Sequence, residues 1–387
     1  MKRFTYVCAD PGIPIPGAKG ASIHVASVCR ALQKAGLTGE VFTLRPEAET
    51  LEGLPLYPIK IPPRRKHKSL EERESRLFLA SLNSVISPQD PPDMIYERYT
   101  LWHCGGLARA RKLGVPFILE VNSPLPEEES RYRSMANRPL AEGIAQLLLR
   151  EADGIVCVSG EVAEWVEGIR GHSRGVWVIP NGVDPELFTA GKRSRPEPLP
   201  PSPVPLVVFS GSFRPWHGLE DLLEAFRLLV QNAVQDAHLV CVGDGPVRLA
   251  FQQKADDVGI SEKIHFTGQI PHEEVPRWLG CADLAVAPYP DLENFYFSPL
   301  KIFEFLCLGL PVIATAIGQV PQLIPHQERG YLCSPGNPQE LADAMALLLR
   351  NRELAEGLAQ AGREWVLSNA TWAKRVDEIL RRVGELQ

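Results

Sequence analysis

The chain has 387 residues, of which 44% are hydrophobic and 23% charged, so its length predicts two or three domains and its composition excludes a disordered chain. Its 41 Lys and Arg against 47 Asp and Glu leave a formal net charge of −6, and no global basic field is present to hold nucleic acid. The 35 prolines are the unusual feature, because proline breaks helices and marks boundaries.

Apolar, β-rich runs alternate with helical patterns from one end of the chain to the other. Strand–helix–strand units are predicted first at 4–44, 94–121 and 154–182. A second series predicts strands, separated by helices, at 205–212, 238–245, 263–268, 284–290 and 311–315. Strands that are apolar throughout and alternate with helices indicate parallel sheets covered by helices on both faces.

A Pro-rich segment separates the two series, since residues 194–205 contain six prolines. Such a segment cannot enter the interior of a helix or sheet, so it predicts an extended linker, with a surface loop inside one domain as the alternative. We therefore expect two doubly wound, Rossmann-like α/β domains, at 1–193 and 206–370. A ligand crevice is expected at the carboxyl ends of both sheets.

The cysteines and the apolar runs bear on the compartment. The eight cysteines contain no C-x-x-C pair and mostly lie in apolar runs, which predicts free thiols in a reducing cytoplasm. The N-terminal MKRFTYVCADPG favours a first strand over a signal peptide. The most apolar run, from Ile302, is interrupted by Glu304, Gly309 and Pro311 and is too broken to span a bilayer. A soluble, cytoplasmic protein is the expectation.

A basic cluster precedes an amphipathic helix in the first series. The cluster is Arg64, Arg65, Lys66 and Lys68, and Ser69 with Glu72 three residues later predicts the start of the helix. A basic cluster of this kind fits peripheral contact with anionic lipid at the inner face of a membrane. The alternative is a solvated surface, because the acidic residues that follow dilute the charge.

Glycines follow the predicted strands in both series. They are Gly17 and Gly20 after the first strand of the chain, and Gly211, Gly243 and Gly245 in the second series. Backbone N–H groups at a strand–helix turn favour phosphate, although any tight turn uses glycine. No G-x-G-x-x-G follows the first strand and GxxxxGK[ST] is absent, which disfavours hydride transfer and P-loop chemistry.

Charged side chains stand next to these turns in the second series. Arg214 could grip a diphosphate through its two-pronged guanidinium, with His217 assisting or serving as an ordinary turn residue. Ser298 is expected to cap the next apolar helix, where Lys301 would add positive charge near a bound anion. Glu304, one turn into that helix, is either a paired core carboxylate or the acceptor of two ribose hydroxyls.

These segments, taken in order, resemble a retaining glycosyltransferase of the GT-B fold, family 4. The resemblance is carried by GAKGASIHVASVCRAL, VIPNGVDPELF, FSGSFRPWHGLEDLLEAF, VGDGP and FSPLKIFEFLCLGLPVIAT, and it covers almost the whole chain. It implies transfer of a sugar from a UDP- or GDP-linked donor with retention of configuration, without a metal or other cofactor. It also implies that a last helix, at about 371–387, crosses back onto the N-terminal, acceptor-binding domain, and that 206–370 binds the donor.

Family roles carry over with three departures. Of two glutamates separated by seven residues in the family, Glu304 matches the second, but the first falls on Tyr296, where the family contacts the transferred sugar. An Arg…Lys pair for the diphosphate becomes Arg214 and His217, whose charge would depend on pH, and Lys301 could compensate. A family histidine becomes Asn122, which can hydrogen-bond a sugar but cannot act as a base. The implied donor site is completed by Gly17, Lys19, Gly20, Gly211, Gly268, Ile270, Phe297, Ser298, Pro299 and Leu300.

The mechanism implied is departure of the diphosphate, with its charge met by Arg214 and Lys301, and attack of the acceptor hydroxyl from the same face. Glu120 either assists this step or is structural. Three alternatives remain open on this architecture: a nucleotide-sugar epimerase, a sugar phosphorylase, and a non-catalytic nucleotide-sugar sensor.

Overall fold

The computed structural model describes residues 1–61, 69–81, 90–132, 134–191 and 194–386. The chain forms two compact units. Unit 1 comprises residues 1–181, 296–298 and 372–387, and unit 2 comprises residues 182–295 and 299–371. The basic cluster at Arg64, Arg65, Lys66 and Lys68 lies outside the described residues.

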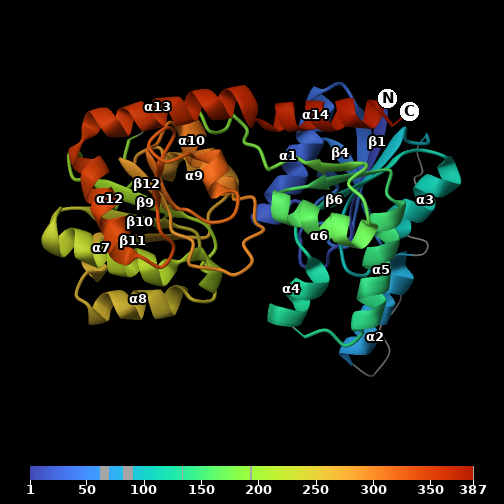
Figure 1. Ribbon diagram of the computed structural model, residues 1–387, viewed down its shortest axis with the longest axis horizontal. Coiled ribbons are helices and arrows are strands. Elements are labelled where there is room, and N and C mark those ends of the chain that lie inside the picture. The colour runs from blue at the N-terminus through green and yellow to red at the C-terminus, as the bar shows by residue number, and fades with distance from the viewer. Residues whose placement is uncertain (62–68, 82–89, 133, 192–193, 387) are drawn as a thin grey trace. The chain divides into compact units, whose positions relative to one another are not determined.

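Unit 1 is built on one mostly parallel sheet, with the strand order β3-β4-β2-β1-β5-β6-β7-β8 in the part of the chain that the structure describes. Strands β1, β4 and β6 of this sheet are labelled in Figure 1. The strands are β1 (Arg3–Cys8), β2 (Thr38–Thr43), β3 (Thr50–Leu51), β4 (Leu54–Pro58), β5 (Met94–Arg98), β6 (Phe117–Val121), β7 (Gly154–Cys157) and β8 (Val176–Val178). The helices are α1 (Gly20–Lys34), α2 (Leu70–Ser81), α3 (Gly105–Leu113), α4 (Leu125–Tyr132), α5 (Arg138–Glu151), α6 (Gly160–Arg170) and α14 (Trp372–Gly384). Only the β3–β4 pair is antiparallel among these described strands.

The order of the strands places a topological switch point in unit 1. β1 lies between β2 and β5, so the connection from β1 leaves on one side and the chain returns on the other. Ligands of doubly wound folds bind outside the carboxyl ends of the strands at such a point. Register pairs Cys8 with Arg98 and Arg98 with Glu120, which brings the ends of β1, β5 and β6 together.

Unit 2 has an entirely parallel sheet with the order β11-β10-β9-β12-β13-β14 among its described strands. Its strands are β9 (Leu206–Ser210), β10 (His238–Val242), β11 (Ile264–Gly268), β12 (Leu284–Ala287), β13 (Val312–Thr315) and β14 (Tyr331–Cys333). Its helices are α7 (Leu219–Asn232), α8 (Arg248–Asp257), α9 (Val275–Leu279), α10 (Leu300–Leu308), α11 (Val320–Leu323), α12 (Pro338–Arg350) and α13 (Arg352–Asn369), with short 3-10 turns η1 (Pro215–His217), η2 (Ser261–Lys263) and η3 (His272–Glu274). The switch point falls between β9 and β12.

Polar side chains start several of the helices. Asn137, Ser159 and Asn351 each accept a hydrogen bond from the backbone N–H three residues on, at 3.1–3.2 Å. Each such cap satisfies one of the N–H groups that a helix end leaves free and contributes about 1 kcal/mol. The predicted start of the helix at 70–81 is confirmed, because the Oγ of Ser69 accepts from the N–H of Glu72 at 3.1 Å.

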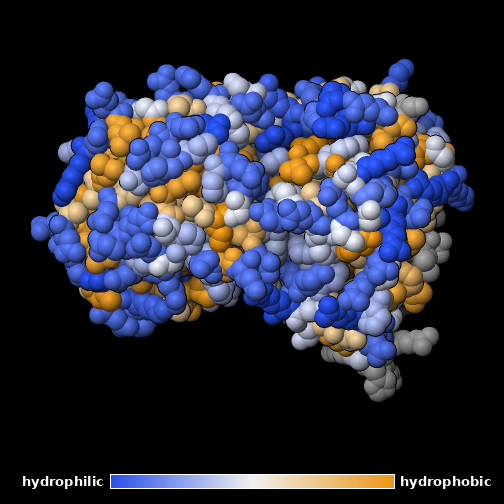
Figure 2. All heavy atoms as spheres, in the orientation of Figure 1, coloured by the Kyte–Doolittle hydropathy of each residue, from blue (hydrophilic) through white to orange (hydrophobic). Residues whose placement is uncertain are grey.

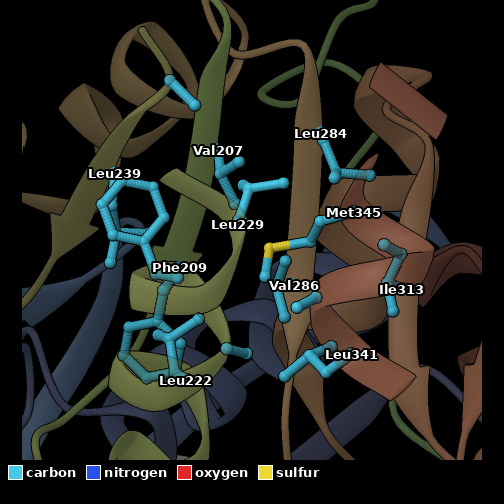
Figure 3. Packing of buried hydrophobic residues seen from close by; sticks show 14 of the residues in the cluster. Val207, Phe209, Leu222, Leu229, Leu239, Leu284, Val286, Ile313, Leu341 and Met345 are labelled. Atoms are coloured by element: carbon cyan, nitrogen blue, oxygen red, sulfur yellow. The ribbon is translucent and has the colours of Figure 1, made fainter. Parts of the chain in front are cut away.

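The core of unit 2 lies between the sheet and helices α7 and α12. Leu222 and Leu229 of α7 and Leu341 and Met345 of α12 pack against strand residues such as Val286 (Figure 3). These side chains are at most 2% exposed, and burying each contributes about 1.5–3 kcal/mol. The apolar strands and amphipathic helices predicted from the sequence therefore form the expected covered parallel sheets.

The Pro-rich segment is not a linker between the units. It belongs to unit 2, and the first chain crossing falls instead between Asn181 and Gly182. The guanidinium of Arg195 holds the segment to itself and to the sheet, donating to the carbonyls of Pro200 at 3.0 Å and Val204 at 2.7 Å and to Asp283 at 2.9 Å. Arg195 therefore fixes the Pro-rich segment, which the sequence predicted to be an extended linker.

Among the described residues, no helix is both long and apolar enough to cross a membrane. On the face drawn in Figure 2, hydrophilic and hydrophobic atoms are interspersed.

Candidate functional site

The turn that follows β9 in unit 2 is shaped by glycine. Gly211 has a backbone φ of +139°, a value that residues other than glycine rarely adopt. A Cβ at Gly243 would lie 2.2 Å from the Gly211 carbonyl oxygen, so the turns after β9 and β10 touch through backbone alone. A Cβ at Gly211 would lie 2.9 Å from Nζ of Lys301. Gly211 and Gly243, two of the glycines predicted to favour phosphate, thus let Lys301 lie directly beside the backbone at the switch point.

Lys301, in the first turn of α10, is 8% exposed. Its Nζ makes no hydrogen bond to any described residue. The ammonium lies 4.3 Å from the ring centroid of Phe209 and 5.3 Å from that of Tyr289. Burial lowers the pKa of Lys301 to about 7, against the opposing effect of Glu304. A buried cation without an acceptor is free to bind an anion.

Arg214 and His217 differ from the expected pair of cations. Arg214 is exposed, with its guanidinium carbon 5.6 Å from the ring centroid of Trp216. Nδ1 of His217 lies against the carbonyl oxygen of Ser212 and donates to it. Burial, and then the charge of Lys301, lower the pKa of His217 to about 3, so the ring is neutral at physiological pH. His217, which was expected to carry a positive charge that depends on pH, is therefore uncharged. Lys301 and Arg214 are the basic residues that can carry positive charge at this turn.

Glu304 lies one turn after Lys301 on α10, and its side chain is 12% exposed. Nε2 of His272, in η3, donates to Oε1 of Glu304 at 3.1 Å. The second carboxylate oxygen has no hydrogen-bond partner among the described residues. Glu304 is thus a paired carboxylate with one oxygen still available. Sequence reasoning missed His272, whose only signal was its place just after β11.

Gly268 and Ile270 lie at the carboxyl end of β11, close in sequence to His272. Gly268 has a φ of +67°, and nothing lies within 4 Å of where its Cβ would be. Ile270 is half-buried. From the sequence, the nucleotide base is expected at this open stretch of backbone.

The expected cap of α10 by Ser298 is wrong. The helix begins after Pro299, which as N-cap has no side-chain hydrogen bond, and Leu300 is its first residue. The Oγ of Ser298 instead accepts from the backbone N–H of Asn181 at 2.9 Å, and its carbonyl accepts from Nδ2 of Asn181 at 2.7 Å. Asn181 thus holds both the hydroxyl and the carbonyl of Ser298.

Tyr296 and Phe297 pack into the core of unit 1. Tyr296 is 8% exposed, and its hydroxyl donates to Oε2 of Glu128 at 2.9 Å. Oγ of Ser159 donates to the Tyr296 carbonyl at 2.9 Å. Phe297 packs against the same cluster of buried residues. Tyr296, at the family position that contacts the transferred sugar, therefore makes its hydrogen bonds within unit 1.

Glu120, at the end of β6, is the centre of a buried network in unit 1. Its carboxylate accepts from Tyr96 Oη at 2.8 Å, from Arg98 Nη1 at 2.9 Å and from Asn122 Nδ2 at 2.7 Å. Nε2 of His24 lies 2.8 Å from Oε2, the oxygen that accepts from Tyr96. Burial opposes ionisation, but His24, Arg98 and Asn122 together lower the pKa of Glu120 to about 2. Glu120 is 1% exposed, and these neighbours enclose its carboxylate.

The residues around Glu120 present polar atoms at the switch point of unit 1. Because Nδ2 of Asn122 is turned to Glu120, its Oδ1 faces away and has no partner among the described residues. Arg98 uses only Nη1 within the described part of the chain, and its side chain is 12% exposed. Sequence reasoning missed Arg98 and His24, because the partners come from different strands and a helix. A small cavity beneath the network is lined in part by His24, Glu120, Trp372 and Arg375.

The loop between β1 and α1 is exposed and tightly turned. A Cβ at Gly17 would lie 2.7 Å from the carbonyl oxygen of Pro14. Lys19 is the N-cap of α1 without a side-chain cap, and its Nζ donates to the Gly12 carbonyl at 2.7 Å. Gly20, the first residue of α1, is exposed. The amides of this helix start are therefore not capped by a side chain.

Comparison with known families covers most of the chain. Residues 18–187 match the family described as Glycosyltransferase Family 4, and residues 192–365 match the family described as Glycosyl transferases group 1. Among the described residues, no group of three or more His, Cys, Asp and Glu side chains could hold a metal ion.

Curated relatives of the chain are glycosyltransferases. It is 27% identical over 261 residues to the GDP-mannose-dependent alpha-(1-6)-phosphatidylinositol monomannoside mannosyltransferase of Mycobacterium tuberculosis, a match that spans 63% of this chain and 65% of that protein. It is 27% identical over 391 residues to the D-inositol 3-phosphate glycosyltransferase of Frankia alni, covering 94% of each.

Solved structures share the fold over the full length. A sucrose-phosphate synthase from Thermosynechococcus elongatus has a TM-score of 0.77 at 20% identity and covers 100% of this chain and 99% of its own. HepE from Anabaena, solved in complex with UDP and glucose, has a TM-score of 0.74 at 17% identity and covers 99% of this chain and 100% of its own.

Proposed function

We propose that this chain, which belongs to the family 4 glycosyltransferases of the GT-B fold, transfers a sugar from a nucleotide diphosphate donor to an acceptor hydroxyl with retention of configuration. The observation that carries the proposal is Lys301. Its buried ammonium has no acceptor among the described residues and borders Gly211 at the switch point of unit 2. A diphosphate is the ligand that a cation in this place suits best.

In this proposal unit 2 binds the donor. Lys301 and the exposed Arg214 meet the diphosphate, and the available oxygen of Glu304, held by His272, accepts from a ribose hydroxyl. The base lies near Gly268 and Ile270. UDP or GDP is the expected nucleotide, because one structural neighbour was solved with UDP and several relatives are named as GDP-mannose-dependent.

The chemistry follows from where the charge develops. As the bond to the anomeric carbon breaks, negative charge grows on the departing diphosphate, and the ammonium of Lys301 stabilises it without reorganisation. The acceptor hydroxyl attacks on the face that the diphosphate leaves, and the departing phosphate takes its proton. No side chain of the protein has to serve as the nucleophile.

Unit 1 binds the acceptor in this proposal. Oδ1 of Asn122 accepts from an acceptor hydroxyl, and the free edge of the Arg98 guanidinium donates to an acceptor oxygen. Glu120 is a positioning residue that orients both. Gly17, Lys19 and Gly20, which the resemblance assigns to donor binding, form the exposed and uncapped start of α1, where backbone N–H groups suit phosphate oxygens. The acceptor belongs to glycan, glycolipid or polysaccharide biosynthesis.

The test is a panel of UDP-, GDP- and ADP-sugars with each variant, scored by release of nucleoside diphosphate and by the anomeric configuration of the product. Arg214→Ala and Glu304→Ala should each lower turnover at least about tenfold, or about 1.4 kcal/mol of barrier. Arg277→Ala and Glu262→Ala, which change exposed residues of unit 2, are the controls and should leave turnover unchanged.

The outcomes separate the alternatives. Unchanged turnover in both Arg214→Ala and Glu304→Ala contradicts the proposed donor site. Binding of nucleotide sugars without transfer or hydrolysis across the panel indicates a sensor. Conversion of the donor to its epimer indicates an epimerase, and turnover that requires free phosphate indicates a phosphorylase.

A further inference from the structure

The side-chain nitrogen of Lys301 is buried with no hydrogen-bond acceptor among the described residues. Its Nζ faces the aromatic rings of Phe209 and Tyr289, at 4.3 Å and 5.3 Å from the centroids, and it has no hydrogen-bond acceptor in the described residues. Contact with ring faces offsets only part of the free energy that an ammonium loses when it leaves water. The free protein therefore disfavours the charged form of this side chain.

Nζ of Lys301 closely approaches the backbone of the turn after β9. A Cβ at Gly211 would lie 2.9 Å from Nζ of Lys301 and 3.5 Å from Cε1 of His217, and the φ of +139° suits only glycine there. The turn after β9 is at the switch point of the sheet, where ligands of this kind of fold bind. An anion bound at this turn would lie next to Nζ.

The other charged and titratable groups around Lys301 do not neutralise it. Glu304, on the same helix, raises the pKa of Lys301, but one of its oxygens is occupied by His272 of η3. His217 of η1 is neutral, and Arg214, just before η1, is exposed and positive. Burial raises the pKa of Tyr289, after β12, so that its hydroxyl is neutral as well. Burial is the dominant effect and lowers the pKa of Lys301 to about 7.

We propose that Lys301 binds the donor diphosphate together with a proton: the side-chain amine takes up one proton from solvent as the nucleotide sugar binds, and releases it when the nucleoside diphosphate leaves. This inference rests on the proposed function. No covalent bond of the donor is made or broken in the step, and the solvent is both the source and the sink of the proton.

Proton-linked binding has a defined dependence on pH. With an initial pKa of about 7, binding should take up about 0.9 proton at pH 8, about 0.5 at pH 7 and about 0.1 at pH 6. Affinity for the donor should accordingly fall about tenfold from pH 6 to pH 8, because a growing share of the free protein must first be protonated. The diphosphate of a nucleotide sugar is a diester and does not titrate in this range.

The experiment is isothermal titration calorimetry of the full chain with UDP-glucose, GDP-mannose and the rest of the nucleotide-sugar panel. At each pH the titration is repeated in buffers of different ionisation enthalpy, and the slope of the observed enthalpy gives the number of protons taken up. Lys301→Arg keeps its charge throughout and should bind without proton uptake and without the loss of affinity at pH 8. Lys254→Arg, at an exposed lysine paired with Glu220, is the matched control and should behave as the unmodified chain.

Each result decides a different point. Donor binding without proton uptake at pH 8 overturns this inference and leaves the proposed function intact, as does uptake that persists in Lys301→Arg. Uptake that persists in Lys301→Arg but disappears in His217→Gln assigns the proton to His217 instead. No binding of any nucleotide sugar overturns the proposed function and this inference together. If Lys301→Arg fails to fold, the proton uptake and affinity profile of the unmodified chain decide the question.

Discussion

Nε2 of His272 donates to Oε1 of Glu304 at 3.1 Å, across a turn and a helix that are more than 25 residues apart in the sequence. The bond leaves one carboxylate oxygen of Glu304 available and fixes the direction in which it points. A carboxylate that must meet a ribose hydroxyl gains from this arrangement, because less side-chain freedom is lost on binding.

His272→Ala should therefore raise the KM for the donor about fivefold with a smaller change in kcat, corresponding to about 1 kcal/mol for a half-exposed hydrogen bond. Steady-state kinetics with a saturating acceptor would measure the split. His172→Ala, at an exposed histidine of unit 1, is the control. An unchanged KM for the donor would show that Glu304 does not depend on His272.

Glu120→Gln should destabilise unit 1 by about 3 kcal/mol at pH 7, because it removes the charge that pairs with buried Arg98. The pKa of Glu120 is lowered from 4.5 to about 2 in the folded protein. Its contribution is thus fully present above pH 4.5 and is lost as the pH falls toward 2. Denaturant unfolding across this range would measure it, with exposed Glu164→Gln as control. Equal stability of the two variants at pH 7 would contradict the role of the network.

Gly106→Ala should destabilise the protein by about 2 kcal/mol, since its Cβ would fall 1.9 Å from Oε2 of buried Glu97. The other oxygen of Glu97 is held by Nδ1 of His103 at 2.7 Å, so the carboxylate cannot move freely. Gly143→Ala, at an exposed position of α5 with nothing within 4 Å of the Cβ, should instead stabilise by up to about 1 kcal/mol. Thermal unfolding of the two variants would measure these effects. Equal shifts in Tm for Gly106→Ala and Gly143→Ala would contradict the prediction.

Tyr296→Phe should leave donor discrimination within about twofold of the unmodified chain and lower stability by about 1 kcal/mol, the value of its hydrogen bond to Glu128. Tyr296→Glu should destabilise much more, because it places a carboxylate in the core of unit 1. Kinetics with several nucleotide sugars, alongside unfolding, would test both. A changed preference among donors in Tyr296→Phe would mean that the ring contacts the sugar after all.

The sequence predicted the strands and helices well because their formation depends on residues that are close together in the chain. The runs that became β9, β10, β12 and β13 are almost entirely apolar and lie in a sheet covered on both faces, which is the environment that such runs require. The start of α2 was predicted because Ser69 and its amide partner are three residues apart. Lys301, Glu304 and Gly211 were singled out because glycine and charge next to apolar runs are conspicuous.

Wrong expectations came where a distant partner outcompeted a near one. Ser298 binds Asn181, 117 residues away, instead of capping the helix that follows it. The Pro-rich segment is fixed by Arg195 and Asp283 rather than left as a spacer.

Length and composition predicted two or three domains, the alternation of apolar runs and helical patterns indicated two α/β units, and the ordered motifs resembled a family of sugar transferases. Each of those conclusions rests on residues close in sequence, whose hydrophobic period and motif spacing are readable one after another. Only the tertiary structure decided which polar groups are satisfied. It surrounds Glu120 with Tyr96 and Arg98 of β5, Asn122 after β6 and His24 of α1, and it leaves Lys301 buried without an acceptor among the described residues. Burial and hydrogen-bond pairing depend on groups brought together from across the chain, and they determine which charged residues remain available for a ligand.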